Sequence, residues 1–93
     1  MINTIEDLLQ LEDRQIQLLL RELESENLAI ALISASTNLQ IKIFANMSER
    51  AIDAIKNDMT KHMGIEKNKI ENQQSEIIKI ANSLFDSESW PFE

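Results

Sequence analysis

Side chains that could carry out acid–base, nucleophilic or metal chemistry are few in this sequence. His62 is the only histidine among 93 residues, and cysteine is absent. A disulfide framework, a thiolate zinc site and a cysteine nucleophile are therefore excluded, and one histidine cannot supply a histidine-rich metal site. The single glycine excludes a glycine-rich phosphate loop. We expect a protein that is not an enzyme, has no catalytic residues and needs no metal or cofactor.

Charged residues that could bind a partner gather instead on one predicted helix, which begins after Ser48. Four polar side chains project from the face opposite its apolar stripe: Arg50, Asp53, Asn57 and Lys61. One interpretation is a ridge that contacts a partner. The other is an ordinary solvated face, in which Arg50 and Asp53 form an i,i+3 ion pair. Asp58 lies at the edge of the apolar stripe, where it is either a contact residue or a structural acceptor.

Six helices are predicted to position these side chains. Apolar residues recur at three- and four-residue spacing along most of the chain, which is typical of one buried helix face. The expected N-caps are Thr4, Ser25, Thr37 and Ser48. The second helix is predicted from about Glu12 to Arg21 and the sixth from about Asn68 to Phe85. Gly64 is expected to end the long fifth helix as a left-handed C′ residue. The predicted fold is a compact all-α bundle of about six short helices, in which the long helix carries the charged ridge.

Composition narrows the class of protein further. Sixteen acidic residues against nine basic ones give a net charge of −7, which disfavours nonspecific binding to nucleic acid or to anionic membranes. No apolar run approaches the length of a membrane span, and the first residues do not read as a signal peptide. Apolar residues make up 43% of the chain, enough to build a core. We expect one soluble, cytoplasmic domain.

Two further features are candidate contact sites. Leu18 and Ile41 are apolar residues that point away from the buried stripes of their predicted helices, and Ile33 is a third candidate because of the family resemblance described below. Isolated apolar residues on a surface are common, whereas a contiguous patch would mark a protein contact or self-association. In the acidic tail of residues 86–93, Trp90 and Phe92 flank a proline. The tail is either a short docking peptide, a segment that folds back over the end of the domain, or a frayed end.

Several segments resemble, in order and spacing, the C-terminal helical domain of the flagellar motor switch protein FliG. The most specific segment is Asn46-Met47-Ser48-Glu49-Arg50-Ala51. The others are Glu12-Asp13-Arg14-Gln15-Ile16-Gln17, Leu28-Ala29-Ile30-Ala31-Leu32, Asn57-Asp58-Met59 and Ile70-Glu71-Asn72-Gln73-Gln74. The resemblance covers roughly residues 6–84. It implies residues 1–5 as the remnant of a hinge, residues 6–85 as the domain and residues 86–93 as a tail.

The resemblance also implies a function. In that family the domain lies on the rim of the cytoplasmic rotor ring of the flagellar basal body, beside other switch proteins. There it faces the stator protein MotA, and a charged ridge contributes to torque and switching. Arg50 and Asp58 match charged positions of this ridge. At three other positions the sequence departs from the family's charges. Ile33 and Asn57 are uncharged where the family has a charged residue, and Glu66 is acidic where the family has a basic one. Because a transient electrostatic contact depends on its charge pattern, a divergent stand-alone relative that acts as an adaptor or regulator is the alternative.

Overall fold

A computed structural model describes residues 2–85, and this part of the chain is helical, with no strand. One 3₁₀ helix precedes five α-helices: η1 (Ile5–Gln10), α1 (Asp13–Arg21), α2 (Ser25–Leu32), α3 (Thr37–Phe44), α4 (Glu49–Lys61) and α5 (Lys67–Phe85). The predicted all-α fold is confirmed. Residues 86–93, which include Trp90 and Phe92, lie outside the described residues.

The N-caps agree with the sequence for two of the four predicted helix starts and differ by one residue for the others. Ser48 caps α4 as predicted, since its Oγ accepts the N–H of Ala51 at 3.2 Å, and Thr4 precedes η1. The prediction of Thr37 was wrong because Ser36 caps α3, accepting the N–H of Leu39 at 3.1 Å. Ser25 was also wrong, because the extended residue before α2 is the one preceding it, Glu24.

The end of α4 contains the left-handed glycine that the sequence predicted. Gly64 has a φ of +88°, and no other residue of the described range has a positive φ. Glycine adopts this conformation without a steric penalty. The helix ends at Lys61 with His62 as its C-cap, so Gly64 lies one residue beyond the C′ position that we expected. It turns the chain from α4 towards α5.

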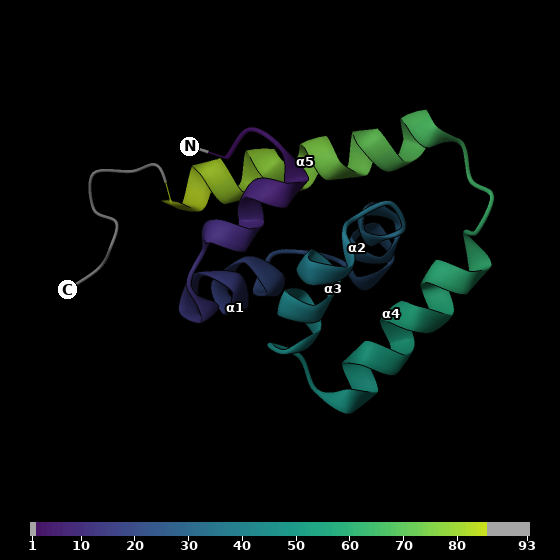
Figure 1. The fold of residues 1–93 in the computed structure, drawn as a ribbon, viewed down its shortest axis with the longest axis horizontal. Helices are drawn as coiled ribbons and strands as arrows, with labels where there is room; N and C mark the ends of the chain where they lie inside the picture. The colour runs from purple at the N-terminus through teal and green to yellow at the C-terminus, as the bar shows by residue number, and fades with distance from the viewer. Residues whose placement is uncertain (1, 86–93) are drawn as a thin grey trace.

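Helix α2 occupies the centre of the fold. Figure 1 shows it nearly end-on, between α5 on one side and α4 on the other, and it packs against both. The C-terminal part of α2 consists only of apolar residues, and these residues, 28–32, are all buried. A helix that is apolar around its circumference requires burial on all sides. By contrast, Ile55 is the only fully buried residue of α4, so α4 covers α2 with one face and leaves the other exposed.

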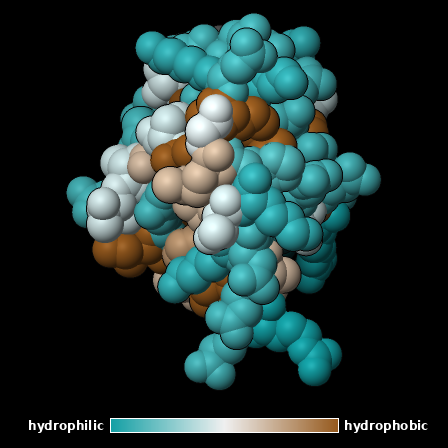
Figure 2. Space-filling model, turned by 90° about the vertical axis from the view of Figure 1, so that its right-hand side faces the viewer, coloured by the Kyte–Doolittle hydropathy of each residue, from teal (hydrophilic) through white to brown (hydrophobic). Residues whose placement is uncertain are grey.

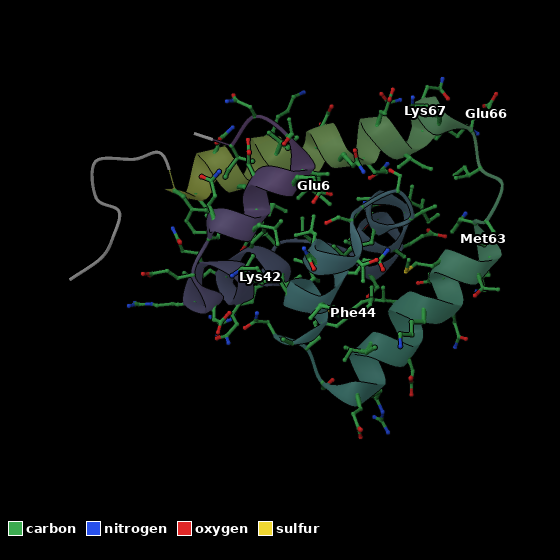
Figure 3. All side chains as sticks on the ribbon, in the orientation of Figure 1. Glu6, Lys42, Phe44, Met63, Glu66 and Lys67 are labelled. Carbon is green, nitrogen blue, oxygen red and sulfur yellow. The ribbon has the colours of Figure 1, made fainter. Side chains whose placement is uncertain are left out.

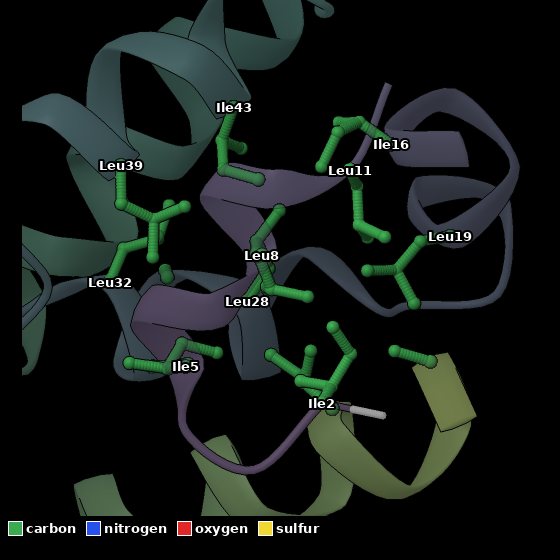
Figure 4. Packing of buried hydrophobic residues seen from close by; sticks show 14 of the residues in the cluster. Ile2, Ile5, Leu8, Leu11, Ile16, Leu19, Leu28, Leu32, Leu39 and Ile43 are labelled. Atoms are coloured by element: carbon green, nitrogen blue, oxygen red, sulfur yellow. The ribbon is translucent and has the colours of Figure 1, made fainter. Parts of the chain in front are cut away.

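The N-terminal segment is part of the same core. Ile2 and Ile5 are only 7% and 8% exposed, and Figure 4 shows them beside Leu8, Leu28 and Leu32. Residues from α1 and α3 complete the cluster: Ile16, Leu19, Leu39 and Ile43. Polar contacts hold the segment in place as well. The carboxylate of Glu6 accepts hydrogen bonds from the backbone N–H and the hydroxyl of Ser36, 30 residues away.

Asp7 gives this segment a predictable pH dependence. Its Oδ2 accepts the backbone N–H of Asn3 at 2.9 Å and that of Thr4 at 3.0 Å. The hydrogen bond from Asn3, and then that from Thr4, lowers the pKa of Asp7 below its ordinary value of 3.8. Because the folded-state pKa is the lower one, the stabilisation is complete above the unfolded pKa and is lost as the pH falls through the folded pKa.

We therefore expect the variant Asp7→Asn to be less stable than the wild type at neutral pH. Its stability should also fall less steeply on acidification than that of the wild type. Urea unfolding at a series of pH values between neutral and strongly acidic measures both effects. Parallel stability curves for the two proteins across this range would contradict the role assigned to the carboxylate.

Candidate partner-binding surface

The outward face of α4 carries the polar residues that the sequence singled out. Arg50, Asp53, Asn57 and Lys61 are all exposed. On the inward side, Ile55 is buried, and Met59 packs against the core. The structure therefore brings the four side chains together on one solvent-facing surface, hereafter the α4 ridge. Asp58 lies at its edge, with a side chain that is 22% exposed.

Ion pairing on the ridge differs in one detail from the solvated-face interpretation, which included a pair between Arg50 and Asp53. In the described part of the chain, Arg50 and Asp53 do not form the expected i,i+3 ion pair. The pair that forms is Lys61 with Asp58, at 3.9 Å between Nζ and Oδ1. An exposed pair of this kind contributes about 0–1 kcal/mol. The carboxylate of Asp58 is thus paired with a residue of its own helix, whereas the charges of Arg50 and Asp53 are available to bind another molecule.

Contacts near the C-terminus and the middle of α4 fix its position on the domain. Near its C-terminus, His62 Nε2 lies 3.0 Å from Glu26 Oε2 in the first turn of α2. His62 is thus a mostly buried, hydrogen-bonded histidine, with a side chain 26% exposed. Nearer the middle, Lys56 Nζ lies 5.6 Å from the centroid of the Phe44 ring in α3, a cation–π contact. Figure 3 shows Phe44 between α3 and α4.

The surface beyond the ridge is mostly polar. Figure 2 shows the face at the α4–α5 connection, where hydrophilic residues surround a smaller group of hydrophobic ones. Glu66 and Lys67 lie at this connection (Figure 3). Lys67 forms an i,i+4 pair with Glu71 at 4.0 Å. The acidic side chain of Glu66 is exposed, so its negative charge faces solvent.

The three apolar candidates lie on different elements. Leu18 is in α1, Ile33 is the C-cap of α2 and Ile41 is in α3. Ile41 is 60% exposed, whereas the other two are partly exposed. A single contact patch formed by all three stays a prediction. Trp90 and Phe92, the tail candidates, belong to residues outside the described range.

One feature of the surface was not predicted: a hollow of about 420 Å³ between α1 and α4. Gln17 and Asn46 both line it, and Gln17 Nε2 donates to Asn46 Oδ1 at 3.0 Å. Arg21 and Ser25 also line the hollow. No sequence pattern reveals such a site, because its walls come from helices that are separated by about 30 residues and become neighbours only in the fold.

The described residues hold no cluster suited to a metal ion and no membrane-spanning helix. Within residues 2–85, no group of three histidine, cysteine, aspartate or glutamate side chains converges. Similarly, no helix in this range is both long enough and apolar enough to cross a bilayer.

Comparison with known proteins places this arrangement among flagellar proteins. Residues 1–89 match the model of the FliG C-terminal domain. Over 80 residues, the chain is 45% identical to the flagellar motor switch protein FliG of Thermotoga maritima; the match covers 85% of this chain and 24% of that protein. Against the FliG of Borreliella burgdorferi the identity is 39%, covering 85% and 23%. The chain thus spans about a quarter of the length of these relatives.

Solved structures agree with this comparison. The structure of full-length FliG from Aquifex aeolicus superposes with a TM-score of 0.86 at 31% identity, over 92% of this chain and 27% of that one. A FliG fragment from H. pylori gives a TM-score of 0.84 at 28% identity, over 90% of this chain and 40% of that one.

Proposed function

The chain belongs to the FliG C-terminal domain family, and we propose that it is part of a flagellar rotor, at the cytoplasmic face of the basal body. In this proposal the α4 ridge contacts the stator protein MotA and contributes to torque generation and switching, next to other rotor proteins. Residues 6–85 form the helical domain that makes this contact. The observation that carries the proposal is the exposed face of α4, on which Arg50 and Asp53 have no ion-pair partner within residues 2–85.

A ridge of exposed charges suits a contact that forms and breaks repeatedly. Electrostatic complementarity accelerates association and selects the partner, whereas exposed pairs add little affinity. Such contacts weaken with salt, because exposed charges are screened over about 8 Å at physiological ionic strength. The partner therefore engages quickly and leaves quickly. This behaviour fits a stator that passes successive rotor subunits.

The attachment of α4 would transmit force from the ridge to the domain. Ile55 anchors its inner face in the core, and the His62–Glu26 hydrogen bond ties its C-terminal end to α2. Because these contacts hold α4 at two separate points, a lateral force on Arg50 or Lys61 would be transmitted to the whole domain. A helix held at only one point would yield to the same load.

Charge reversal at Arg50 tests the proposal. Losing one exposed attraction and gaining a repulsion of similar size should weaken binding to a MotA cytoplasmic segment by about 2- to 30-fold at low salt. Isothermal titration or surface binding at two salt concentrations measures this effect, and swimming assays measure the consequence. The matched control is Lys69→Glu, which makes the same change in charge at an exposed position of α5.

Two results would count against the stator role. The first is equal binding by Arg50→Glu, Lys69→Glu and the wild type. The second is full motility in cells whose only copy carries Arg50→Glu together with Asp53→Lys. A folded domain with no measurable affinity for the MotA segment would favour the alternative, an adaptor or regulator that keeps the fold. The loss of the family's charges at Ile33 and Asn57 is the feature that favours this alternative.

A further inference from the structure

The hollow between α1 and α4 has an apolar lining that no element of residues 2–85 covers. Six apolar side chains contribute to it: Leu20, Leu23, Leu28, Met47, Ala51 and Ile55. Leu20, Leu23 and Met47 are only partly buried, although each packs against the core. The exposed lining is therefore available to an apolar side chain from elsewhere. We call this hollow the α1–α4 groove.

One arginine lines the groove, and a second lies on the same face of α1. Arg21 is the lining residue, and Arg14 lies seven residues earlier in α1, within about 20° of Arg21 around the helix axis. Both side chains are exposed, and neither forms an ion pair with another residue of the described range. An apolar floor beside two unpaired guanidinium groups suits an acidic segment that carries an aromatic side chain.

The last turn of α5 ends close to Arg21. Ser83 and Leu84 line a second hollow together with Glu22, the residue that follows Arg21. The chain continues after Phe85 with the sequence Asp-Ser-Glu-Ser-Trp-Pro-Phe-Glu. Trp90 is the fifth residue after Phe85, so it can lie at most about 17–18 Å from the end of α5, whereas α1, with nine residues, is about 13.5 Å long. The segment is therefore long enough to reach the groove from the end of α5.

We propose that residues 86–93 bind in the α1–α4 groove of the same molecule. Trp90 places its ring on the apolar lining, and the acidic residues of the segment lie beside Arg21 and Arg14. The segment has three carboxylates and no basic side chain, so its charge complements the two guanidinium groups. Pro91 restricts the backbone next to Trp90, which lowers the entropic cost of ordering the segment. This site is on the opposite side of α4 from the ridge, so it does not depend on stator contact.

Fluorescence of Trp90 tests the proposal directly, because it is the only tryptophan and the chain has no tyrosine. In the wild type we expect emission at a shorter wavelength than that of a free 86–93 peptide, and slower quenching by acrylamide. In Arg21→Glu the ratio of bound to released segment should fall about 2- to 30-fold at low salt. Emission and quenching should then approach those of the free peptide.

A second variant and a control separate binding from a folding defect. Ser25 lines the groove and is exposed at the start of α2, where an acidic residue suits the helix dipole. Ser25→Glu should release the segment without unfolding the domain, as circular dichroism would verify. Lys69→Glu makes the same charge change as Arg21→Glu but lies away from the groove, and it should leave the emission unchanged.

Three outcomes would overturn the proposal. One is a wild-type emission and quenching rate equal to those of the free peptide. Another is a shielded Trp90 that responds to neither Arg21→Glu nor Ser25→Glu, since the ring would then lie elsewhere. The third is shielding that appears only as the protein concentration rises, because the segment would then occupy a second copy instead of its own groove.

Discussion

Replacing Leu32 with alanine should lower the free energy of unfolding by about 2–5 kcal/mol, the usual range for removing a fully buried leucine side chain. Leu32 is 1% exposed and ends the central helix α2. Figure 4 shows it beside Leu39 of α3 and near Ile5 of η1. The cavity left by the substitution therefore opens where three elements meet. A domain of this size has a stability of about 5–15 kcal/mol, so the loss is a large fraction of the total.

Urea unfolding followed by circular dichroism measures this effect. The matched control is Ile41→Ala, which removes an aliphatic side chain of similar size from a position that is 60% exposed. We expect the control to change the stability by no more than about 0.5 kcal/mol. Similar losses for the two variants would show that the centre of the core lies elsewhere.

Helix positions were predictable because apolar periodicity reports which face of each segment is buried. The N-cap of α3 was not, because it is decided by tertiary contact. Ser36 and Thr37 are both good caps by residue type, and it is Ser36 that meets the carboxylate of Glu6. The 3₁₀ geometry of η1 was also missed. Its apolar spacing matches that of an α-helix, and only the hydrogen bonds distinguish the two.

For the candidate site, the exposure of side chains on one helix could be predicted from the sequence, whereas contacts between helices could not. The exposure of Arg50 and Lys61 follows from their positions opposite Ile55, since side-chain direction in a helix repeats every 3.6 residues. Which partner each side chain finds does not follow. The contact of His62 with Glu26 joins residues 36 positions apart, and the α1–α4 groove depends on how two helices approach across α2. Such features require the arrangement of the helices in space.

Asn82 makes a contact of the same long-range kind, at the other end of the fold. Its Oδ1 accepts the backbone N–H of Ile2 at 2.8 Å, and its Nδ2 donates to the backbone C=O of Ile2 at 2.9 Å. One side chain thus satisfies both backbone groups of a buried residue 80 positions away. Because Ile2 lies in no helix or strand, this pair of bonds supplies the hydrogen bonds of its backbone and holds the N-terminal segment against α5.

Replacing Asn82 with alanine should therefore cost about 1–3 kcal/mol, because it leaves a partly buried N–H and C=O without partners. Urea unfolding gives the total loss. Amide hydrogen exchange at Ile2 shows whether the segment opens locally, and we expect its protection to fall further than that of core amides in α2. Asn72→Ala, at an exposed position of the same helix, should change neither quantity appreciably. If Asn82→Ala behaved like Asn72→Ala, packing of Ile2 and Ile5 alone would be sufficient to hold the N-terminal segment on α5.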